Sequence, residues 1–417
     1  MSAPPLRVLI WTEAHWVGGS DRFLVDLVRA LDDRFAWRLA GIESPDHDRW
    51  LARQLPDVSE RIVVPIASLP GSPLTALRRR LSRGDQPPAD LSAAASDVSV
   101  PVKAAVAALR YRHAATNLMR LGRLMHRARP DVLMINNGGY PGGESCRYAA
   151  IAARRAGVPR VVHFVHNMAY PPNWPPVVER AIDARVDGAV DAWVTAARRA
   201  SVQLADVRGM RADRVHTVHY GVPPAPQVAA AARGELGYVD GALALAVVAA
   251  LEPRKGHLVL LNALKMLRER GTEVRTALVG AGPEEPRLRR RVAELGLGEH
   301  VRILGRRDDV DAILRASDAL ALPSLSNECL PYAILEAMAH GLPVVGTDVA
   351  GIPEEIDDGV TGHVVAPGHA PSLADAIAAL AADPARRRAM GEAGRGRVRS
   401  EFGIERMVDA VTALWAP

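Results

Sequence analysis

The chain has 417 residues, of which 48% are hydrophobic and 24% are charged, with a formal net charge of +5. This length exceeds one ordinary hydrophobic core and predicts two domains of about 200 residues each. Only two cysteines occur, Cys146 and Cys329, which argues against a disulfide framework and a zinc site. No apolar run reaches the roughly 18 residues of a membrane-spanning helix. The start, MSAPPLRVLIWTE, lacks the features of a signal peptide, so we expect a cytoplasmic protein.

Strand-like runs alternate with helical patterns in the first half of the chain. Leu6 to Thr12 is typical of a buried strand, and a Gly18-Gly19 turn and a helical pattern from Asp21 to Leu31 follow it. Further strands are predicted at 61–65, 132–135, 161–166, 192–195 and 215–218. This alternation predicts a parallel sheet with helices on both faces.

The periodicity breaks between residues 221 and 243, and a second alternating series follows. Its predicted strands are 245–251, 276–280, 301–305, 319–323, 343–347 and 362–365. We therefore predict two facing, doubly wound Rossmann-like α/β domains, 1–222 and 223–400. Residues 401–417 form a predicted C-terminal helix, for which packing back on the N-terminal domain is one option. Because open parallel sheets bind ligands beyond the carboxyl ends of their strands, the site is expected in the cleft between the domains.

The most informative stretch runs from Ala319 to Ile356. A strand ends at Pro323, a polar loop carries Glu328, and a helix that contains Glu336 begins near Pro331. The start of that helix directs free N–H groups and a positive dipole into the cleft, which favours phosphate. Two carboxylates at this spacing suit the recognition of hydroxyl groups. An isolated pair of glutamates is more often a loop residue and a solvated helix residue, but the apolar neighbours of Glu336 make an unpaired carboxylate costly there.

The same stretch, ECLPYAILEAMAHGLPVVGTDVAGIPEEI, resembles the donor-binding signature of retaining glycosyltransferases of family 4. RKGHLVLLNAL (254–264), ALVGAGPEEPRL (277–288) and HVRILGRRDDV (300–310) agree with that family, as do GGSDRFLVDLVRAL (18–31) and HFVHN (163–167). The resemblance covers nearly the whole chain and is strongest over 245–366. It implies the GT-B fold, with two facing Rossmann-like domains, and a nucleotide-activated sugar as donor.

The resemblance also implies roles for individual residues. Glu336 is expected to bind the ribose hydroxyls of the donor, and Glu328 the hydroxyls of its sugar. Backbone N–H groups would assist Glu328; they belong to Leu330, Tyr332 and Ala333. Lys255 matches the lysine that neutralises the leaving diphosphate, and His166 matches a histidine that faces the donor sugar. We accordingly predict His166, Lys255 and Glu328 as the catalytic residues.

Three further positions belong to the predicted donor site. Gly18 and Gly19 lack a Cβ and so permit a close approach of the first loop to the ligand. Arg306 is expected near the nucleotide base. Members of the family usually carry an arginine five residues before the lysine, where Ala250 stands here. Either Arg254 supplies the missing charge or the phosphate clamp is built differently.

A basic segment covers residues 101–129. Lys103 to Arg129 contains seven Lys or Arg and no acidic residue, and four of them lie near one helical stripe: Arg112, Arg120, Arg123 and Arg127. One interpretation is an amphipathic helix that makes weak peripheral contact with the inner face of an anionic membrane. The other is an ordinary helix with its apolar side on the sheet and a solvated basic face, and we favour it.

The sequence thus predicts a metal-independent, retaining glycosyltransferase without a cofactor, using a UDP- or GDP-linked sugar and an acceptor hydroxyl. The acceptor is a glycan, a lipid-linked precursor or a small natural product, and the oligomeric state is open. The alternatives are a catalytically silent nucleotide-sugar-binding module and another GT-B enzyme, such as a nucleotide-sugar epimerase. Nucleic acid is not expected as a partner, because no helix-turn-helix, zinc or aromatic stacking signature accompanies the high pI.

Overall fold

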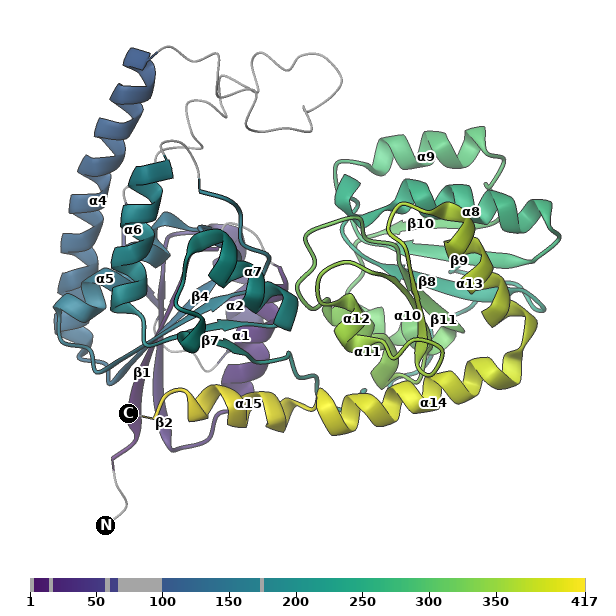
Figure 1. The fold of residues 1–417 in the computed structure, drawn as a ribbon. Helices are drawn as coiled ribbons and strands as arrows, with labels where there is room; N and C mark the ends of the chain where they lie inside the picture. The colour runs from purple at the N-terminus through teal and green to yellow at the C-terminus, as the bar shows by residue number, and fades with distance from the viewer. Residues whose placement is uncertain (1–3, 15–17, 57–60, 67–99, 173–175, 417) are drawn as a thin grey trace.

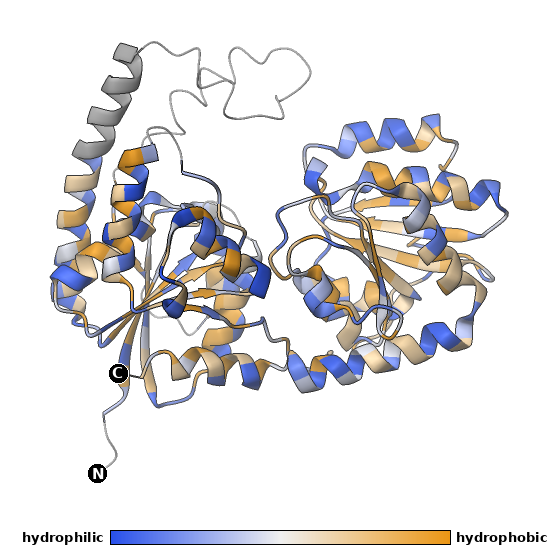
Figure 2. Ribbon diagram, viewed as in Figure 1, coloured by the Kyte–Doolittle hydropathy of each residue, from blue (hydrophilic) through white to orange (hydrophobic). Residues whose placement is uncertain are grey.

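The protein was analysed as a computed structural model, which describes residues 4–14, 18–56, 61–66, 100–172 and 176–416. The side chains of residue 46 and of residues 100–112 are not described. The chain forms two α/β units side by side (Figure 1). Each unit is built on a parallel sheet, and the strands of both sheets consist mainly of buried apolar residues (Figure 2). Strands that are apolar on both faces are expected where helices cover both sides of a sheet.

The first sheet has seven strands in the order β3-β2-β1-β4-β5-β6-β7. Their bounds are β1 Leu6–Thr12, β2 Phe35–Gly41, β3 Arg61–Val63, β4 Val132–Asn137, β5 Arg160–Val165, β6 Ala192–Thr195 and β7 Val215–Thr217. The helices around it are α1 Gly19–Ala30, α2 Pro45–Gln54, α4 Val100–Ala128, α5 Glu144–Arg155, α6 Pro176–Ala189 and α7 Arg198–Arg208. A 3-10 turn, η2 Ala212–Arg214, precedes β7.

The second sheet has six strands in the order β10-β9-β8-β11-β12-β13. They are β8 Leu243–Val248, β9 Val274–Val279, β10 Val301–Gly305, β11 Ala319–Leu322, β12 Val344–Thr347 and β13 Gly362–Val365. Its helical elements are η3 Pro253–Lys255, α8 His257–Glu269, α9 Glu285–Glu294, α10 Val310–Ala316, α11 Tyr332–Ala339, α12 Ile352–Glu355, α13 Ala370–Ala382 and α14 Pro384–Glu401.

These sheets agree closely with the predicted strands, with one omission. Strand β2 was not predicted, although it pairs in parallel with β1 over its whole length. Its sequence, FAWRLAG, carries Arg38 in the middle and is buried only at its carboxyl end. This strand lies between β1 and the edge strand β3, and because its polarity is mixed it contains no continuous apolar run that would predict it.

The last helix, α15 Ile404–Ala413, leaves the second unit and runs beneath the first (Figure 1). Trp415 is fully buried, and its ring meets that of Phe35 edge-on at a centroid distance of 5.2 Å. Arg160 Nε donates to the carbonyl of Leu414 at 2.8 Å. The end of the chain therefore packs on the first sheet and α1.

The chain crosses between the units twice, and the two crossings lie together. Val222 N donates to the Phe402 carbonyl at 2.9 Å, and Val222 forms an isolated bridge with Gly403. A Cβ at Gly221 would lie 2.6 Å from the Gly403 carbonyl oxygen, so this approach needs glycine. We refer to these paired crossings, 221–227 and 402–405, as the hinge.

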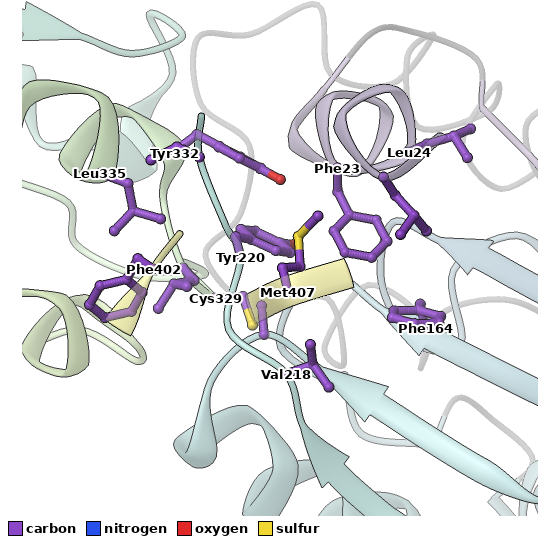
Figure 3. Packing of buried hydrophobic residues seen from close by; sticks show 14 of the residues in the cluster. Phe23, Leu24, Phe164, Val218, Tyr220, Cys329, Tyr332, Leu335, Phe402 and Met407 are labelled. Atoms are coloured by element: carbon purple, nitrogen blue, oxygen red, sulfur yellow. The ribbon is translucent and has the colours of Figure 1, made fainter. Parts of the chain in front are cut away.

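One hydrophobic cluster continues from the first unit into the second. Figure 3 shows Phe23 and Phe164 of the first unit beside Tyr220, Met407, Cys329 and Tyr332. Tyr220 and Tyr332 stack with ring centroids 4.7 Å apart. The aromatic packing holds the two units face to face and fixes the orientation of α11.

Candidate donor site

The strand order locates the site. In each sheet the chain direction of the crossovers reverses once, between β1 and β4 in the first and between β8 and β11 in the second. Ligands of doubly wound sheets bind at this switch point, beyond the carboxyl ends of the strands. The residues there are Asn136 near the carboxyl end of β4 in the first unit and the loops after β8 and β11 in the second. The second pair of loops contains Lys255 and Glu328.

Glu328 is the centre of a buried polar cluster. Its side chain is 6% exposed, and it accepts a hydrogen bond from Ser324 Oγ at 2.9 Å. Arg254 Nη1 lies 3.3 Å from Glu328 Oε1, and Lys255 Nζ also donates to that oxygen. Two cations therefore meet the Glu328 carboxylate, and Arg254 Nε also donates to Glu252 Oε2 at 2.7 Å, so the charges of these four groups balance.

The backbone holds these charges in place. Gly256 follows Lys255 with φ of +71°, and a Cβ there would lie 1.9 Å from the Pro323 carbonyl oxygen. Leu325 N donates to the Arg254 carbonyl at 2.7 Å. The loop after β8 is thus tied to the loop after β11. Asn327 adopts φ of +56°, a left-handed conformation that asparagine tolerates better than most residues.

Glu336 lies on α11 and faces the first unit. Its side chain is 23% exposed, and Arg22 Nη1 of α1 lies 3.8 Å from its Oε1. Burial raises the pKa of Glu336 to about 7 despite the opposing charge of Arg22, and the carboxylates of Asp311 and Asp26 add to the increase. A ligand hydroxyl that donates a hydrogen bond to this carboxylate would stabilise its ionised form.

His166 is held more tightly than the sequence suggests. It is 8% exposed, its Nε2 lies 2.6 Å from Asn136 Oδ1, and its Nδ1 lies 2.8 Å from the Tyr220 hydroxyl. Burial lowers the pKa of His166 to about 3, so the ring is neutral at physiological pH. Because the amide oxygen only accepts, Nε2 carries the proton and Nδ1 accepts from Tyr220. Both ring nitrogens are therefore engaged within the first unit and its neighbouring linker.

The remaining predicted residues lie at the starts of α1 and α11, with the exception of Arg306. A Cβ on Gly19 would lie 4.0 Å from Tyr332 Cδ2, so the starts of α1 and α11 approach each other across the cleft. Tyr332 and Ala333 begin α11, and Leu330 precedes its N-cap Pro331; the first N–H groups of a helix have no acceptor within it. Gly18 precedes α1. Arg306 is exposed after the edge strand β10, away from the Glu328 cluster.

The structure also shows polar residues at the domain boundary that the sequence reasoning missed. Glu354 of α12 accepts from the N–H groups of Arg198 at 2.9 Å and Arg199 at 3.1 Å, and His219 Nε2 lies 3.1 Å away. These contacts lower the pKa of Glu354 although its burial acts in the opposite direction. A residue of the second unit thus caps α7 of the first. The -PEE- sequence gives no sign of this, because the cap comes from a distant segment.

Neither a metal cluster nor a membrane span emerges from the residues that the structure describes. They contain no group of three or more His, Cys, Asp or Glu side chains placed to hold a metal ion. Among the described helices, none is long and apolar enough to cross a bilayer. In α4, Leu121, Leu124 and Met125 are buried against the sheet, whereas Arg123 and Arg127 are exposed. The apolar side of this part of α4 is therefore occupied by the core.

Two facing doubly wound sheets with a polar cluster at the switch point of the second define the GT-B class of proteins. Solved structures share this fold. HepE from Anabaena in complex with UDP aligns with a TM-score of 0.73 at 18% identity, over 98% of this chain and 99% of the other. A glycosyltransferase from Rickettsia africae aligns with a TM-score of 0.74 at 16% identity, over 99% and 98% of the two chains.

The chain belongs to glycosyltransferase family 4. The model of that family, "Glycosyltransferase Family 4", matches residues 17–225, and the "Glycosyl transferases group 1" model matches residues 230–397. The predicted family and fold are therefore confirmed.

Curated relatives include a GDP-mannose-dependent phosphatidylinositol monomannoside mannosyltransferase of Mycolicibacterium smegmatis, 34% identical over 58% of this chain and 66% of the relative. A D-inositol 3-phosphate glycosyltransferase of Saccharomonospora viridis is 33% identical over 64% and 66%. An N-acetyl-alpha-D-glucosaminyl L-malate synthase of Bacillus anthracis is 36% identical over 34% and 37%. The matches thus span between about a third and two thirds of the length of these relatives.

Proposed function

We propose that the protein is a configuration-retaining glycosyltransferase that moves a sugar from a nucleotide sugar to an acceptor hydroxyl without a metal ion. The observation that carries this proposal is the cluster of Lys255, Arg254 and Ser324 around Glu328, at the switch point of the second sheet. Lysine and arginine side chains next to a buried carboxylate suit a ligand that combines phosphates with sugar hydroxyls.

The proposed donor lies with its diphosphate between Lys255 and the start of α11. The N–H groups of Leu330, Tyr332 and Ala333 and the positive end of the helix dipole would face its phosphates and sugar. Glu328 binds sugar hydroxyls, and Glu336 binds the ribose hydroxyls. The 3.3 Å contact between Arg254 and Glu328 supports the idea that Arg254 provides the charge absent at Ala250. Gly18 and Gly19 give the ligand space on the opposite side, and Arg306 lies toward the base.

In the proposed reaction the acceptor oxygen bonds to the anomeric carbon as the bond to the diphosphate oxygen breaks. The leaving diphosphate takes the bonding electron pair and receives the acceptor's proton. Lys255, Arg254 and the α11 dipole stabilise the negative charge that develops on it. His166 lies neutral behind this site, and its bonds to Asn136 and Tyr220 support a positioning role at the face of the donor sugar.

The donor is proposed to be UDP- or GDP-linked, because a relative is a GDP-mannose-dependent mannosyltransferase and a structural neighbour binds UDP. We propose residues 1–222 as the acceptor domain and 223–400 as the donor domain, with the helix in 401–417 attached to the former. The acceptor is proposed to be a polyol or lipid-linked hydroxyl compound, since the relatives act on inositol phosphate and phosphatidylinositol compounds. The buried free thiols of Cys146 and Cys329 are compatible with a reducing cytoplasm, at whose membrane face a lipid acceptor would be met.

A thermal-shift screen with UDP, GDP and their sugar conjugates tests the proposal. We expect one nucleotide class to stabilise the protein and its sugar conjugate to be slowly hydrolysed to free nucleotide. Binding without turnover, with any tested acceptor, would indicate the silent module. Conversion to an isomeric nucleotide sugar would indicate an epimerase. If no nucleotide binds, the assignment of the site is wrong.

A further inference from the structure

A second cavity lies at the hinge, on the opposite edge of the second sheet from the donor site. Its volume is about 830 Å³, and its walls include Pro343, where β12 is about to begin, and Ser317 and Asp318, which precede β11. The donor loops follow the carboxyl ends of the strands, whereas this cavity lies at their amino ends. The two sites are therefore separate, and α11 runs from one to the other.

The cavity is strongly basic. Five arginines line it, against the two acidic side chains of Asp318 and Glu405; the arginines are Arg315, Arg387, Arg388, Arg395 and Arg399. Asp318 is already engaged, with Arg387 Nη2 and Arg233 Nη2 each 3.7 Å from its carboxylate oxygens. Within the described part of the chain, Arg315, Arg388 and Arg399 have no carboxylate partner. Unpaired arginines that share a recess suit a phosphate or carboxylate ligand.

Helix α14 carries the basic stripe of this cavity. Arg388, Arg395 and Arg399 are spaced by seven and four residues, which places them on one face of the helix over about 16 Å. The first two turns of α14 also contain three consecutive arginines, 386–388, which follow the N-cap Asp383, whose carboxylate accepts from the N–H groups of Ala385 and Arg386. Cations at a helix N-terminus oppose the macrodipole, by about 0.3–1 kcal/mol each. The Asp383 carboxylate offsets part of this cost, and a bound anion would offset more of it.

The cavity is also formed by both hinge segments. Residues 222–225 and Gln227 line it from the first crossing, and Gly403 and Glu405 from the second. The end of α11 lies against α14, because a Cβ on Gly391 would be 1.9 Å from the Gly341 carbonyl oxygen. Arg395 Nη2 donates to the His340 carbonyl at 3.0 Å. Figure 1 shows α14 running under the second unit and leading into α15 under the first.

We propose that this hinge cavity binds a small soluble polyanion with two or more phosphate groups, and that this binding is coupled to nucleotide affinity at the donor site. The volume is within the range of sites for small ligands, about 300–1,000 Å³. A ligand that contacts both hinge segments has a higher affinity for one degree of domain closure than for another. That difference is what coupling between two sites requires. The coupling rests on the proposed donor site, whereas the anion binding does not.

Equilibrium binding of inorganic tripolyphosphate tests the first half of the proposal. We expect a triple variant, Arg315→Gln, Arg388→Gln and Arg399→Gln, to bind it at least tenfold more weakly than the unaltered protein. A control with the same loss of charge, Arg155→Gln, Arg180→Gln and Arg185→Gln, replaces exposed arginines of α5 and α6 and should remain within twofold. Equal losses in both variants, or none in either, would overturn the site. All variants are first compared by thermal unfolding, and the substitutions are at exposed positions to preserve the fold.

Two further arms separate the hinge cavity from other anion sites. Tripolyphosphate binding should persist in a Lys255→Ala variant, because that residue belongs to the donor site; loss there would mean that the probe binds at the donor site. Flotation with phosphatidylglycerol vesicles tests whether the cavity binds a lipid headgroup instead. If the protein binds these vesicles through the three arginines but does not bind tripolyphosphate, the proposal of a soluble ligand is wrong. Coupling predicts that saturating tripolyphosphate changes nucleotide affinity at least threefold in the unaltered protein and not in the triple variant. Unchanged affinity in both would refute the coupling while leaving the donor site intact.

Discussion

The titration of Glu336 gives the sharpest test of the donor site. Its pKa is raised to about 7 by burial, so near neutral pH the carboxyl is partly protonated before the donor arrives. Ribose hydroxyls that donate to the carboxylate favour its ionised form. The pKa of Glu336 should therefore fall when the donor binds, and binding should release a proton below pH 7.

The magnitude follows from these values. If the bound carboxylate stays ionised, the apparent donor affinity is reduced in proportion to the fraction of free protein in which Glu336 is ionised. That fraction corresponds to a factor of about 11 at pH 6 and about 1.1 at pH 8, so the donor Kd should be about tenfold larger at pH 6. The sign is fixed: affinity rises with pH and reaches a plateau above 7.

The assay is calorimetry with a nucleotide sugar, whose diphosphate has no free terminal phosphate to titrate in this range. Glu336→Gln should remove the pH dependence and weaken binding by about 10- to 100-fold at pH 8, as expected for losing a charged hydrogen-bond acceptor worth about 1.5–3 kcal/mol. Glu269→Gln, an exposed glutamate on α8, serves as the matched control. An unaltered slope in Glu336→Gln, or a flat profile in the unaltered protein, would show that Glu336 does not contact the donor.

Three other predictions concern the scaffold. Glu354→Ala removes the cap of α7 that is supplied across the domain boundary, and we expect the free energy of unfolding, measured in urea, to fall by about 1–2 kcal/mol. Glu354→Gln should retain most of this stability if its side-chain oxygen still accepts the two hydrogen bonds. Ala350 has φ of +46°, so Ala350→Gly should be neutral or stabilising by up to about 1 kcal/mol, whereas a loss of stability would contradict this backbone conformation. The pKa of His166 is about 3 in the folded protein against an ordinary 6.5, so the unfolded chain binds the extra proton. The contribution of neutral His166 to the free energy of unfolding is thus complete above pH 6.5 and is lost as the pH falls toward 3. In His166→Phe, the free energy of unfolding should therefore fall less steeply between pH 6.5 and pH 3. At pH 7 the same variant should be less stable by about 1–3 kcal/mol, because Asn136 loses its hydrogen-bond partner.

The local pattern determined much of the fold. The buried parallel strands, the glycine turns and the helix start at Pro331 follow from chain-local rules, since each depends on a few neighbouring residues. Strand β2 was not predicted, because its pairing with β1, rather than its own hydrophobicity, makes it a strand. The Glu328–Glu336 spacing and the position of Lys255 after a strand also indicated the cleft, because carboxyl ends of parallel strands meet at one edge.

Tertiary structure decided how those residues interact. The sequence places Lys255 and Arg254 far from Glu328, and only the switch point between β8 and β11 brings the three together. It likewise gave no sign that Asn136 and Tyr220 would occupy both nitrogens of His166, or that Glu354 would cap a helix of the other unit. Such pairs form between segments separated by tens to hundreds of residues, and their geometry depends on how two independent sheets pack at the hinge. The sequence by itself therefore determined the family and the elements, whereas domain packing set the protonation and the partners of the site.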